Sequence, residues 1–283
     1  MDKESLIVKT IDAHQHFWKF NPVRDSWITD EMSVIQKDFF PGDLKPVLQQ
    51  NGFDGCVSVQ ANQSEEETNF LISLASEYDF IKGVVGWVDL QADDIEKKLA
   101  KYKASPVVKG FRHVLQGEPQ RDLMLTPNFK KGIVALQKHG FTYDILIFPD
   151  QIKFSEELVA SFPGQKFVVD HIAKPYIKRK EIEQWKKDME SIAQHQNVYC
   201  KISGMVTEAD WKGWKKDDFA PYLDVVVNAF GTDHILFGSD WPVCLVAASY
   251  EEMLAIVKDY FSSFSKEEQE QFFGMNAIRF YNL

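Results

Sequence analysis

The feature that most constrains the fold of this chain is a regular alternation of short apolar runs with longer amphipathic stretches. The runs are rich in β-branched residues and predict strands, whereas the stretches between them have helical length and periodicity. The predicted strands are Ile11–Trp18, Gly55–Ala61, Ile81–Leu90, Val107–Leu115, Thr142–Phe148, Lys166–Ala173, Val198–Gly204 and His234–Pro242. Helices are predicted near Gly42–Asn51, Glu65–Tyr78, Asp93–Tyr102, Pro127–His139, Gln151–Phe162, Glu181–His195, Asp217–Phe230 and Tyr250–Phe261. This alternation is typical of βαβ units, so we expect a parallel sheet.

Eight strand–helix pairs in 283 residues favour a closed barrel over an open doubly wound sheet. An open sheet of that kind normally has fewer strands and a Gly-rich first turn, and no GxGxxG follows any predicted strand here. No repeat, low-complexity segment or Ser/Gly linker divides the chain. We therefore predict that residues 1–283 form a single α/β domain, a (β/α)8 TIM barrel. The segment Lys19–Phe40 is too long for a simple turn and is predicted to cover the barrel mouth.

Composition excludes several classes of protein. Lys and Arg number 32 against 42 Asp and Glu, a net charge of −10, and no basic tract stands out, so nucleic-acid binding is not expected. No window approaches about 18 consecutive apolar residues, and the N-terminus is too short and too charged for a signal peptide. We expect no membrane association and a cytoplasmic location. The odd number of cysteines, Cys56, Cys200 and Cys244, predicts buried free thiols.

The first predicted strand carries two histidines that alternate with other residues. The two-residue period of a strand places Asp12, His14 and His16 on one face, which in a barrel is the interior. The C-terminal ends of barrel strands surround the active-site mouth. Because paired buried imidazoles are costly without a role, His14 and His16 are candidate metal ligands. The alternative is a pair of core histidines bonded to backbone carbonyls.

Further titratable residues stand at the ends of other predicted strands. Asp240 ends strand eight, which closure brings beside strand one, and a carboxylate there can ligate a metal and accept a proton from water. The alternative for Asp240 is capping of the next helix. His171 ends strand six and supplies a third imidazole, with Lys174 just beyond it.

Strand four and three tryptophans supply candidate substrate-binding residues. Arg112 and His113 end strand four, but alternation allows only one of them to face the barrel interior, and the pattern does not choose. Arg112 is equally compatible with a surface ion pair. Trp18, Trp27 and Trp241 lie near the predicted mouth and suit either stacking on a ligand or packing.

Five motifs carry a family resemblance. They are His14-Gln15-His16 after Ile-Asp, Lys109-Gly110-Phe111-Arg112-His113, Asp170-His171-Ile172-Ala173-Lys174-Pro175, Lys201-Ile202-Ser203-Gly204 and Gly238-Ser239-Asp240-Trp241-Pro242. Together they resemble the amidohydrolase superfamily from Ile11 to the end of the chain, and more narrowly its sugar-lactonase branch of L-fuconolactonases and L-rhamnonolactonases. The resemblance implies a hydrolase that opens a sugar-acid lactone by attack of water on the ring ester. The expected partner is thus a small-molecule lactone.

The resemblance also implies roles and a cofactor. Asp240 and His171 are the expected catalytic residues, and Arg112, His113, Lys174 and the three tryptophans are expected to bind substrate. Binuclear members use a strand-four lysine and a strand-five histidine, but strand five has no histidine and Lys109 lies well before the end of strand four. We therefore expect at most one divalent, zinc-like ion, held by His14, His16 and Asp240. Members of the branch that work without metal leave metal-independent catalysis open.

Three alternative functions remain at this stage. A metal-dependent decarboxylase of the same superfamily shares the two histidines and the strand-eight aspartate but adds no water. A pyrone-dicarboxylate hydrolase would bind an aromatic dicarboxylate, for which arginines are usually recruited, and only Arg112 stands at a predicted strand end. A non-catalytic binding barrel would have no need of four convergent titratable groups.

Overall fold

The computed structural model describes residues 9–283, and its core is a ring of eight parallel strands in sequence order. The strands are β1 Ile11–Gln15, β2 Gly55–Val59, β3 Ile81–Gly86, β4 Val108–His113, β5 Thr142–Ile145, β6 Phe167–Val169, β7 Val198–Ile202 and β8 Ile235–Phe237. Residues after β8 close the ring against β1, since Asp240 N donates to His14 O (2.8 Å) and His16 N donates to Trp241 O (2.7 Å). The predicted TIM barrel is confirmed.

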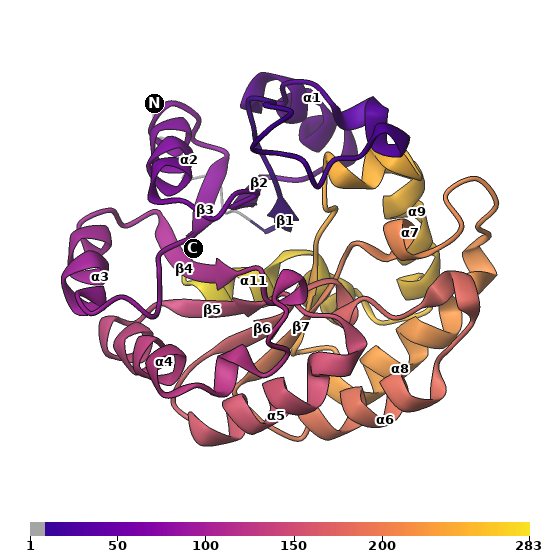
Figure 1. Cartoon of the computed structure of the whole chain (residues 1–283). Helices are drawn as coiled ribbons and strands as arrows, with labels where there is room; N and C mark the ends of the chain where they lie inside the picture. The colour runs from indigo at the N-terminus through magenta and orange to yellow at the C-terminus, as the bar shows by residue number, and fades with distance from the viewer. Residues whose placement is uncertain (1–8) are drawn as a thin grey trace.

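Helices surround the strands as an outer layer (Figure 1). They are α1 Pro41–Asn51, α2 Glu65–Glu77, α3 Ile95–Lys103, α4 Pro127–His139, α5 Ile152–Ser161, α6 Glu183–Ile192, α7 Met205–Glu208, α8 Ala220–Phe230, α9 Tyr250–Phe261, α10 Lys266–Glu270 and α11 Asn276–Tyr281. Local sequence explains their ends. For example, Ser249 and Glu252 form a capping box at the start of α9, and Gly140 ends α4 with φ 73°.

The C-terminal helix α11 closes one end of the barrel, a feature that the strand–helix alternation does not predict. Ala277, Phe280 and Tyr281 pack with apolar side chains of the barrel interior, including Val57 and Val168. Near the start of β4, Lys109 Nζ donates to Asn282 O (2.8 Å). Lys109 therefore lies at the end of the barrel opposite the strand ends that carry the candidate site.

The strands are shorter than the sequence predicts. Strand β6 ends at Val169, and the next residues turn with left-handed φ angles of 55°, 48°, 57° and 49° at His171, Ile172, Ala173 and Lys174. Each such residue costs roughly 1–2 kcal/mol unless the surroundings stabilise it. A residue run that looks like strand in sequence thus forms a tight turn at the barrel mouth.

Two expectations about the whole chain have direct structural outcomes. Cys56, Cys200 and Cys244 are buried free thiols, as predicted. Among residues 9–283, none of the helices combines the length and apolar character needed to cross a bilayer.

Candidate active site

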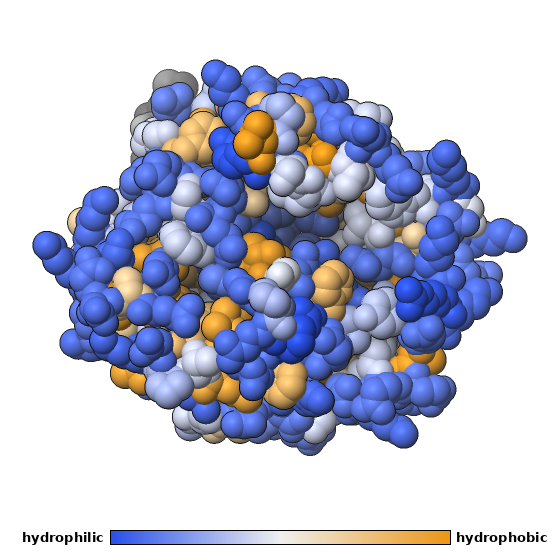
Figure 2. All heavy atoms as spheres, in the orientation of Figure 1, coloured by the Kyte–Doolittle hydropathy of each residue, from blue (hydrophilic) through white to orange (hydrophobic). Residues whose placement is uncertain are grey.

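A cavity of about 440 Å³ opens at the C-terminal ends of the strands. Figure 2 shows a mostly hydrophilic face with a hollow near its centre. Arg24, Trp27 and Met32 of the segment Lys19–Phe40 contribute to the cavity wall, which confirms that this segment lies at the mouth. The lining residues with ionisable side chains are His16, Arg24, Arg112, His171, Lys174, Glu208 and Asp240.

Three side chains from the β1 and β8 ends converge on one point. His14 Nε2 lies 3.2 Å from His16 Nε2, and Asp240 Oδ1 lies 3.3 Å from His16 Nε2 and 3.8 Å from His14 Nε2. All three side chains are buried. The glycine of the strand-eight motif makes this approach possible, because a Cβ on Gly238 would lie 2.6 Å from His14 Cβ.

Asp12 does not join this group, contrary to the expectation from strand alternation. Its carboxylate accepts from Ser239 N (2.9 Å) and from Tyr250 Oη of α9 (3.2 Å), so it faces the helical layer. The pairing of β1 with β2 shifts register between Asp12 and Gln15. That irregularity breaks the two-residue period on which the expectation depended.

The hydrogen-bond partners of the two histidines indicate which ring nitrogen of each can present a lone pair to the site. His16 Nδ1 is 2.8 Å from Val59 O, which can only accept, so Nδ1 donates and Nε2 is the nitrogen that presents a lone pair whenever the ring is neutral. Arg112 Nη1 is 3.3 Å from His14 Nε2 and can only donate, so this nitrogen also carries a lone pair. Burial lowers the pKa of His14 well below its usual value, which keeps the ring neutral.

This arrangement fits a divalent cation. Two imidazole lone pairs and a carboxylate oxygen face one another, an arrangement that is repulsive without a positive charge between them. A tetrahedral zinc ion with ligands at about 2.0–2.1 Å places those ligand atoms about 3.3 Å apart. The separations of 3.2, 3.3 and 3.8 Å among His14, His16 and Asp240 are close to that value. The backbone carbonyl behind His16 is the kind of partner that orients metal-binding histidines.

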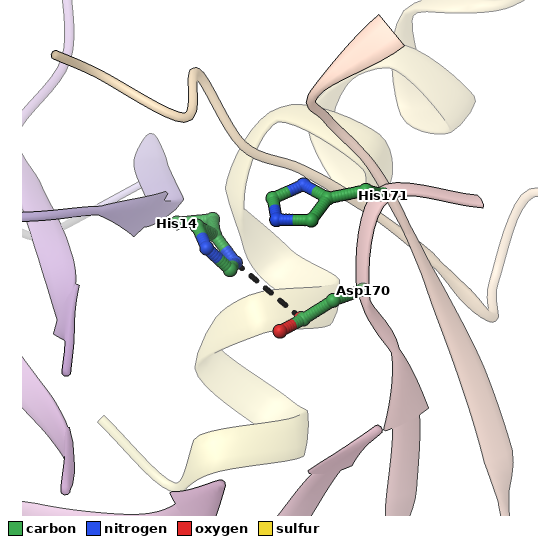
Figure 3. Close-up of side chains that lie close together, drawn as sticks. All are labelled: His14, Asp170 and His171. Atoms are coloured by element: carbon green, nitrogen blue, oxygen red, sulfur yellow. Dashed lines mark ion pairs between the residues drawn. The ribbon is translucent and has the colours of Figure 1, made fainter. Parts of the chain in front are cut away.

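A second group, His14, Asp170 and His171, also brings possible ligand atoms together (Figure 3). His14 Nδ1 lies 3.3 Å from Asp170 Oδ1, and the His171 ring stands beside them. However, Asp170 already contacts two cations, Arg112 Nη1 at 2.9 Å and Lys201 Nζ at 3.1 Å. These fixed positive charges oppose the binding of a second metal ion there.

Lys201 is fully buried beneath the site on β7. Its ammonium lies 2.5 Å from Asp144 Oδ2 on β5 and 3.2 Å from His14 Nδ1, in addition to its contact with Asp170. Tyr281 of α11 donates to the same Asp144 oxygen (2.8 Å). These residues form an ion network beneath the cavity, which we call the barrel floor. The network holds Asp170 in place and, through Asp170, the ring of His14.

His171 is held at the start of the left-handed turn that follows β6. Its Nδ1 lies 2.9 Å from Ser203 Oγ, and its Nε2 lies 3.9 Å from Asp240 Oδ1. Gly204 leaves room for the ring, since a Cβ there would lie 2.6 Å from His171 Nδ1. Burial lowers the pKa of His171 to about 4, so the ring is neutral near pH 7.

Asp240 is ionised in these surroundings. Burial alone would raise its pKa, but the surrounding histidines, which favour the charged carboxylate when they carry a proton toward it, outweigh burial and hold the pKa below its usual range. A buried carboxylate that is charged, faces a cavity and lies beside imidazoles can accept a proton from a bound water.

The two candidates on β4 are separated by the strand alternation. Arg112 faces inward, lines the cavity and donates to Gln60 O (2.5 Å) as well as to Asp170. His113 points elsewhere, with Nε2 2.7 Å from Glu118 Oε1 and Nδ1 3.4 Å from Trp87 Nε1. The structure therefore brings Arg112, but not His113, into the candidate site.

The other predicted substrate-binding residues are placed differently from one another. Lys174 lines the cavity and lies 3.5 Å from Glu208 Oε1. Trp27 lines the cavity and is partly exposed. Trp18 and Trp241 are buried and both pack edge-on against Phe39, so among the described residues they stand behind the cavity wall.

The sequence profile of the amidohydrolase family matches residues 11–283. The chain belongs to the amidohydrolase family. An L-fucono-1,5-lactonase from Burkholderia multivorans is 35% identical to this amidohydrolase over 284 residues, covering 96% of each chain. A crystal structure of an amidohydrolase from the same organism, with bound zinc, matches with a TM-score of 0.92 and 35% identity, covering 97% of this chain and 99% of that one. A probable 2-pyrone-4,6-dicarboxylic acid hydrolase from Acinetobacter baumannii has a TM-score of 0.79 at 17% identity, covering 97% of this chain and all of that one, and shares the fold.

Sequence reasoning assigned no role to several residues of this amidohydrolase site. Asp144 and Lys201 were available as charged residues within apolar strands, a pattern that signals buried pairing. Arg24 gave no signal, because only the folded mouth segment brings it to the cavity. The family and the zinc-bound relative suggest a divalent metal, and His14, His16 and Asp240 form a group able to hold one.

Proposed function

We propose that this protein is a lactonase that hydrolyses the ring ester of a sugar-acid lactone such as an L-fuconolactone. The observation that carries the proposal is the convergence of His14, His16 and Asp240 at the floor of an open cavity. That geometry suits activation of water beside a carbonyl group. The 35% identity to L-fucono-1,5-lactonases over nearly the full chain supports the substrate class.

We further propose that one zinc-like ion belongs to the site, with His14 Nε2, His16 Nε2 and Asp240 as its protein ligands. When bound, such an ion polarises a carbonyl oxygen and lowers the pKa of water. Lys201 and Arg112 form ion pairs with the neighbouring carboxylate of Asp170. Because these charges oppose a second cation, the site holds a single ion.

The protein's own residues account for the proton transfers. Asp240 accepts a proton from the attacking water while the oxygen of that water bonds to the lactone carbonyl carbon. The C–O ring bond then breaks, and the proton held on Asp240 passes to the departing alkoxide, so that hydroxyl and carboxyl groups result. Arg112 and the neutral His171 flank the site and can stabilise the negative charge that develops on the carbonyl oxygen.

The cavity wall suits a hydroxylated ring. Trp27, Met32 and Leu146 offer apolar surface, while Lys174 and Glu208 offer a donor and an acceptor. Arg24 joins Arg112 at the wall, although it is paired with Asp25 (2.7 Å) and Arg112 with Asp170. With both guanidinium groups engaged by protein carboxylates, the wall favours a neutral lactone over a dicarboxylate.

A panel of substrates in one buffer tests the proposal, with acid release followed by a pH indicator. We expect five- and six-membered sugar lactones to be hydrolysed far faster than dihydropyrimidine-type cyclic amides, because an alkoxide leaves with less protonation than an amine needs. If pyrone dicarboxylates are hydrolysed fastest, the substrate class would be the lactone of an aromatic acid and not a sugar lactone. Release of CO2 from an aromatic acid, without hydrolysis of any lactone, would identify a decarboxylase instead.

A further inference from the structure

Lys174 and Glu208 form an ion pair in the cavity wall that the hydrolytic step does not use. Lys174 Nζ lies 3.5 Å from Glu208 Oε1, and the side chains are only 17% and 18% exposed. Lys174 ends the left-handed turn after β6, and Glu208 ends the short helix α7 after β7. Both line the cavity that contains Asp240.

The pair has unused hydrogen-bonding capacity. Its separation of 3.5 Å is at the outer limit of a hydrogen bond. Within residues 9–283, no hydrogen bond joins Lys174 Nζ or the Glu208 carboxylate to any other side chain or backbone group. An ammonium has three N–H donors and a carboxylate about four acceptor sites, so most of these remain free to meet a ligand.

The backbone holds both side chains at the wall. The run of left-handed residues that begins at His171 ends at Lys174, and Pro175 follows with its restricted φ. On the other side, Trp211 Nε1 donates to Thr207 O (2.8 Å), which fixes the residue before Glu208. Left-handed non-glycine residues persist only where surroundings impose them, and they concentrate at functional sites.

A donor and an acceptor at this separation suit two neighbouring hydroxyl groups. Two neighbouring hydroxyl groups on a ring present one O–H to donate and one oxygen to accept, side by side. A neutral diol can satisfy both charged groups without leaving either one unpaired. An unsubstituted lactone ring has no O–H to donate to Glu208, so it cannot satisfy both members of the pair.

We propose that Lys174 and Glu208 bind two neighbouring hydroxyl groups on the lactone ring and thereby set the preference of this enzyme for hydroxylated lactones. The inference rests on the proposed lactonase function. It assigns the pair to specificity, while water activation stays with Asp240.

The test compares L-fucono-1,5-lactone with δ-valerolactone, which has the same ring size and no hydroxyl groups. The measured quantity is the ratio of kcat/KM for the first to kcat/KM for the second. In Lys174→Met and Glu208→Gln we expect this ratio to fall about 10- to 100-fold, the loss typical of hydrogen bonds to charged groups. Most of the loss should be in KM for the hydroxylated substrate, because hydroxyl contacts exist before the chemical step.

The matched controls are Lys178→Met and Asp210→Asn, which remove the same charges from an exposed pair whose atoms are 3.8 Å apart. Their ratio should stay within about threefold of wild type, as expected for a surface ion pair. If Glu208→Gln does not fold by circular dichroism, Glu208→Asp replaces it and should lower the ratio in the same direction.

An unchanged ratio in the Lys174 and Glu208 variants would overturn the proposal, including the case where both substrates lose activity equally. A wild-type enzyme that hydrolyses both lactones equally well would also overturn it, while the lactonase function would stand. A wild-type enzyme that hydrolyses neither lactone would instead count against the lactonase function itself.

Discussion

His14 Nε2 and His16 Nε2 face each other across 3.2 Å; Arg112 donates toward the first, and Val59 O accepts from Nδ1 of the second ring, so both Nε2 atoms can present lone pairs. Asp240 Oδ1 completes the group at 3.3 Å from His16. Three electron-rich atoms that converge in a buried site suit a divalent cation between them.

Asp240→Asn should lower the lactone hydrolysis rate by at least about 100-fold, because an amide cannot accept a proton from water at neutral pH. The near-identical shape of the side chain should leave the fold intact by circular dichroism. Asp233→Asn, which neutralises an exposed carboxylate, serves as the control and should retain the wild-type rate. More than about a tenth of the wild-type rate in Asp240→Asn would show that another group is the base.

Protein loaded with zinc and then dialysed should retain about one zinc ion per chain, as measured by elemental analysis. His16→Gln should lose that ion, since it removes one of the converging lone pairs. Two tightly bound ions that both depend on barrel residues would contradict the role given to Lys201 and Arg112. Complete loss of zinc from the wild-type protein during dialysis would contradict the site itself.

The ion network on the barrel floor should contribute strongly to stability. Lys201→Met leaves Asp144 and Asp170 buried with one cation fewer, so the free energy of unfolding should fall by about 3–5 kcal/mol. Lys109→Met is the control, because Lys109 is only partly buried and contacts a backbone carbonyl, and its cost should be below about 1 kcal/mol. Urea unfolding measures both. If the two variants lost equal stability, the network would have no special role.

The pH dependence of stability should report His171. The fold holds its pKa at about 4, below the ordinary value of 6.5, so the unfolded chain takes up a proton first as pH falls. The free energy of unfolding is therefore unaffected by protonation of His171 above pH 6.5. It falls progressively as the pH is lowered to about 4, by up to roughly 3 kcal/mol. With chelator present, the free energy of unfolding of His171→Gln should fall less over this range than that of wild type. Parallel curves for the two proteins would be the contrary result.

Sequence periodicity predicts the barrel because each βαβ unit is encoded locally. Since all strands of a parallel barrel end at the same mouth, the motif residues at the strand ends are then predicted to lie close together. The period of two brings His14 and His16 together, but it misplaces Asp12, because a register shift is set by the neighbouring strand β2. The choice between Arg112 and His113 likewise depends on pairing that one strand does not encode.

Other features depend on contacts between distant segments. The first three residues of the left-handed turn, His171 to Ala173, are predicted as strand because no glycine marks the turn, and the surrounding barrel imposes its conformation. Helix α11 closes the barrel by packing against apolar strand residues far away in sequence. The single-domain organisation and the cytoplasmic location stay predictions.

Isotope incorporation tests the central claim most directly, that Asp240 directs water onto the carbonyl carbon of a sugar lactone. The enzyme is incubated with L-fucono-1,5-lactone in ¹⁸O-labelled water, and the product is analysed by mass spectrometry after subtraction of the spontaneous reaction. Our account predicts enzyme-dependent formation of the acid with one labelled oxygen in the carboxylate, and no such excess with Asp240→Asn. Label in the ring hydroxyl, or equal formation of labelled acid by the variant, would contradict it.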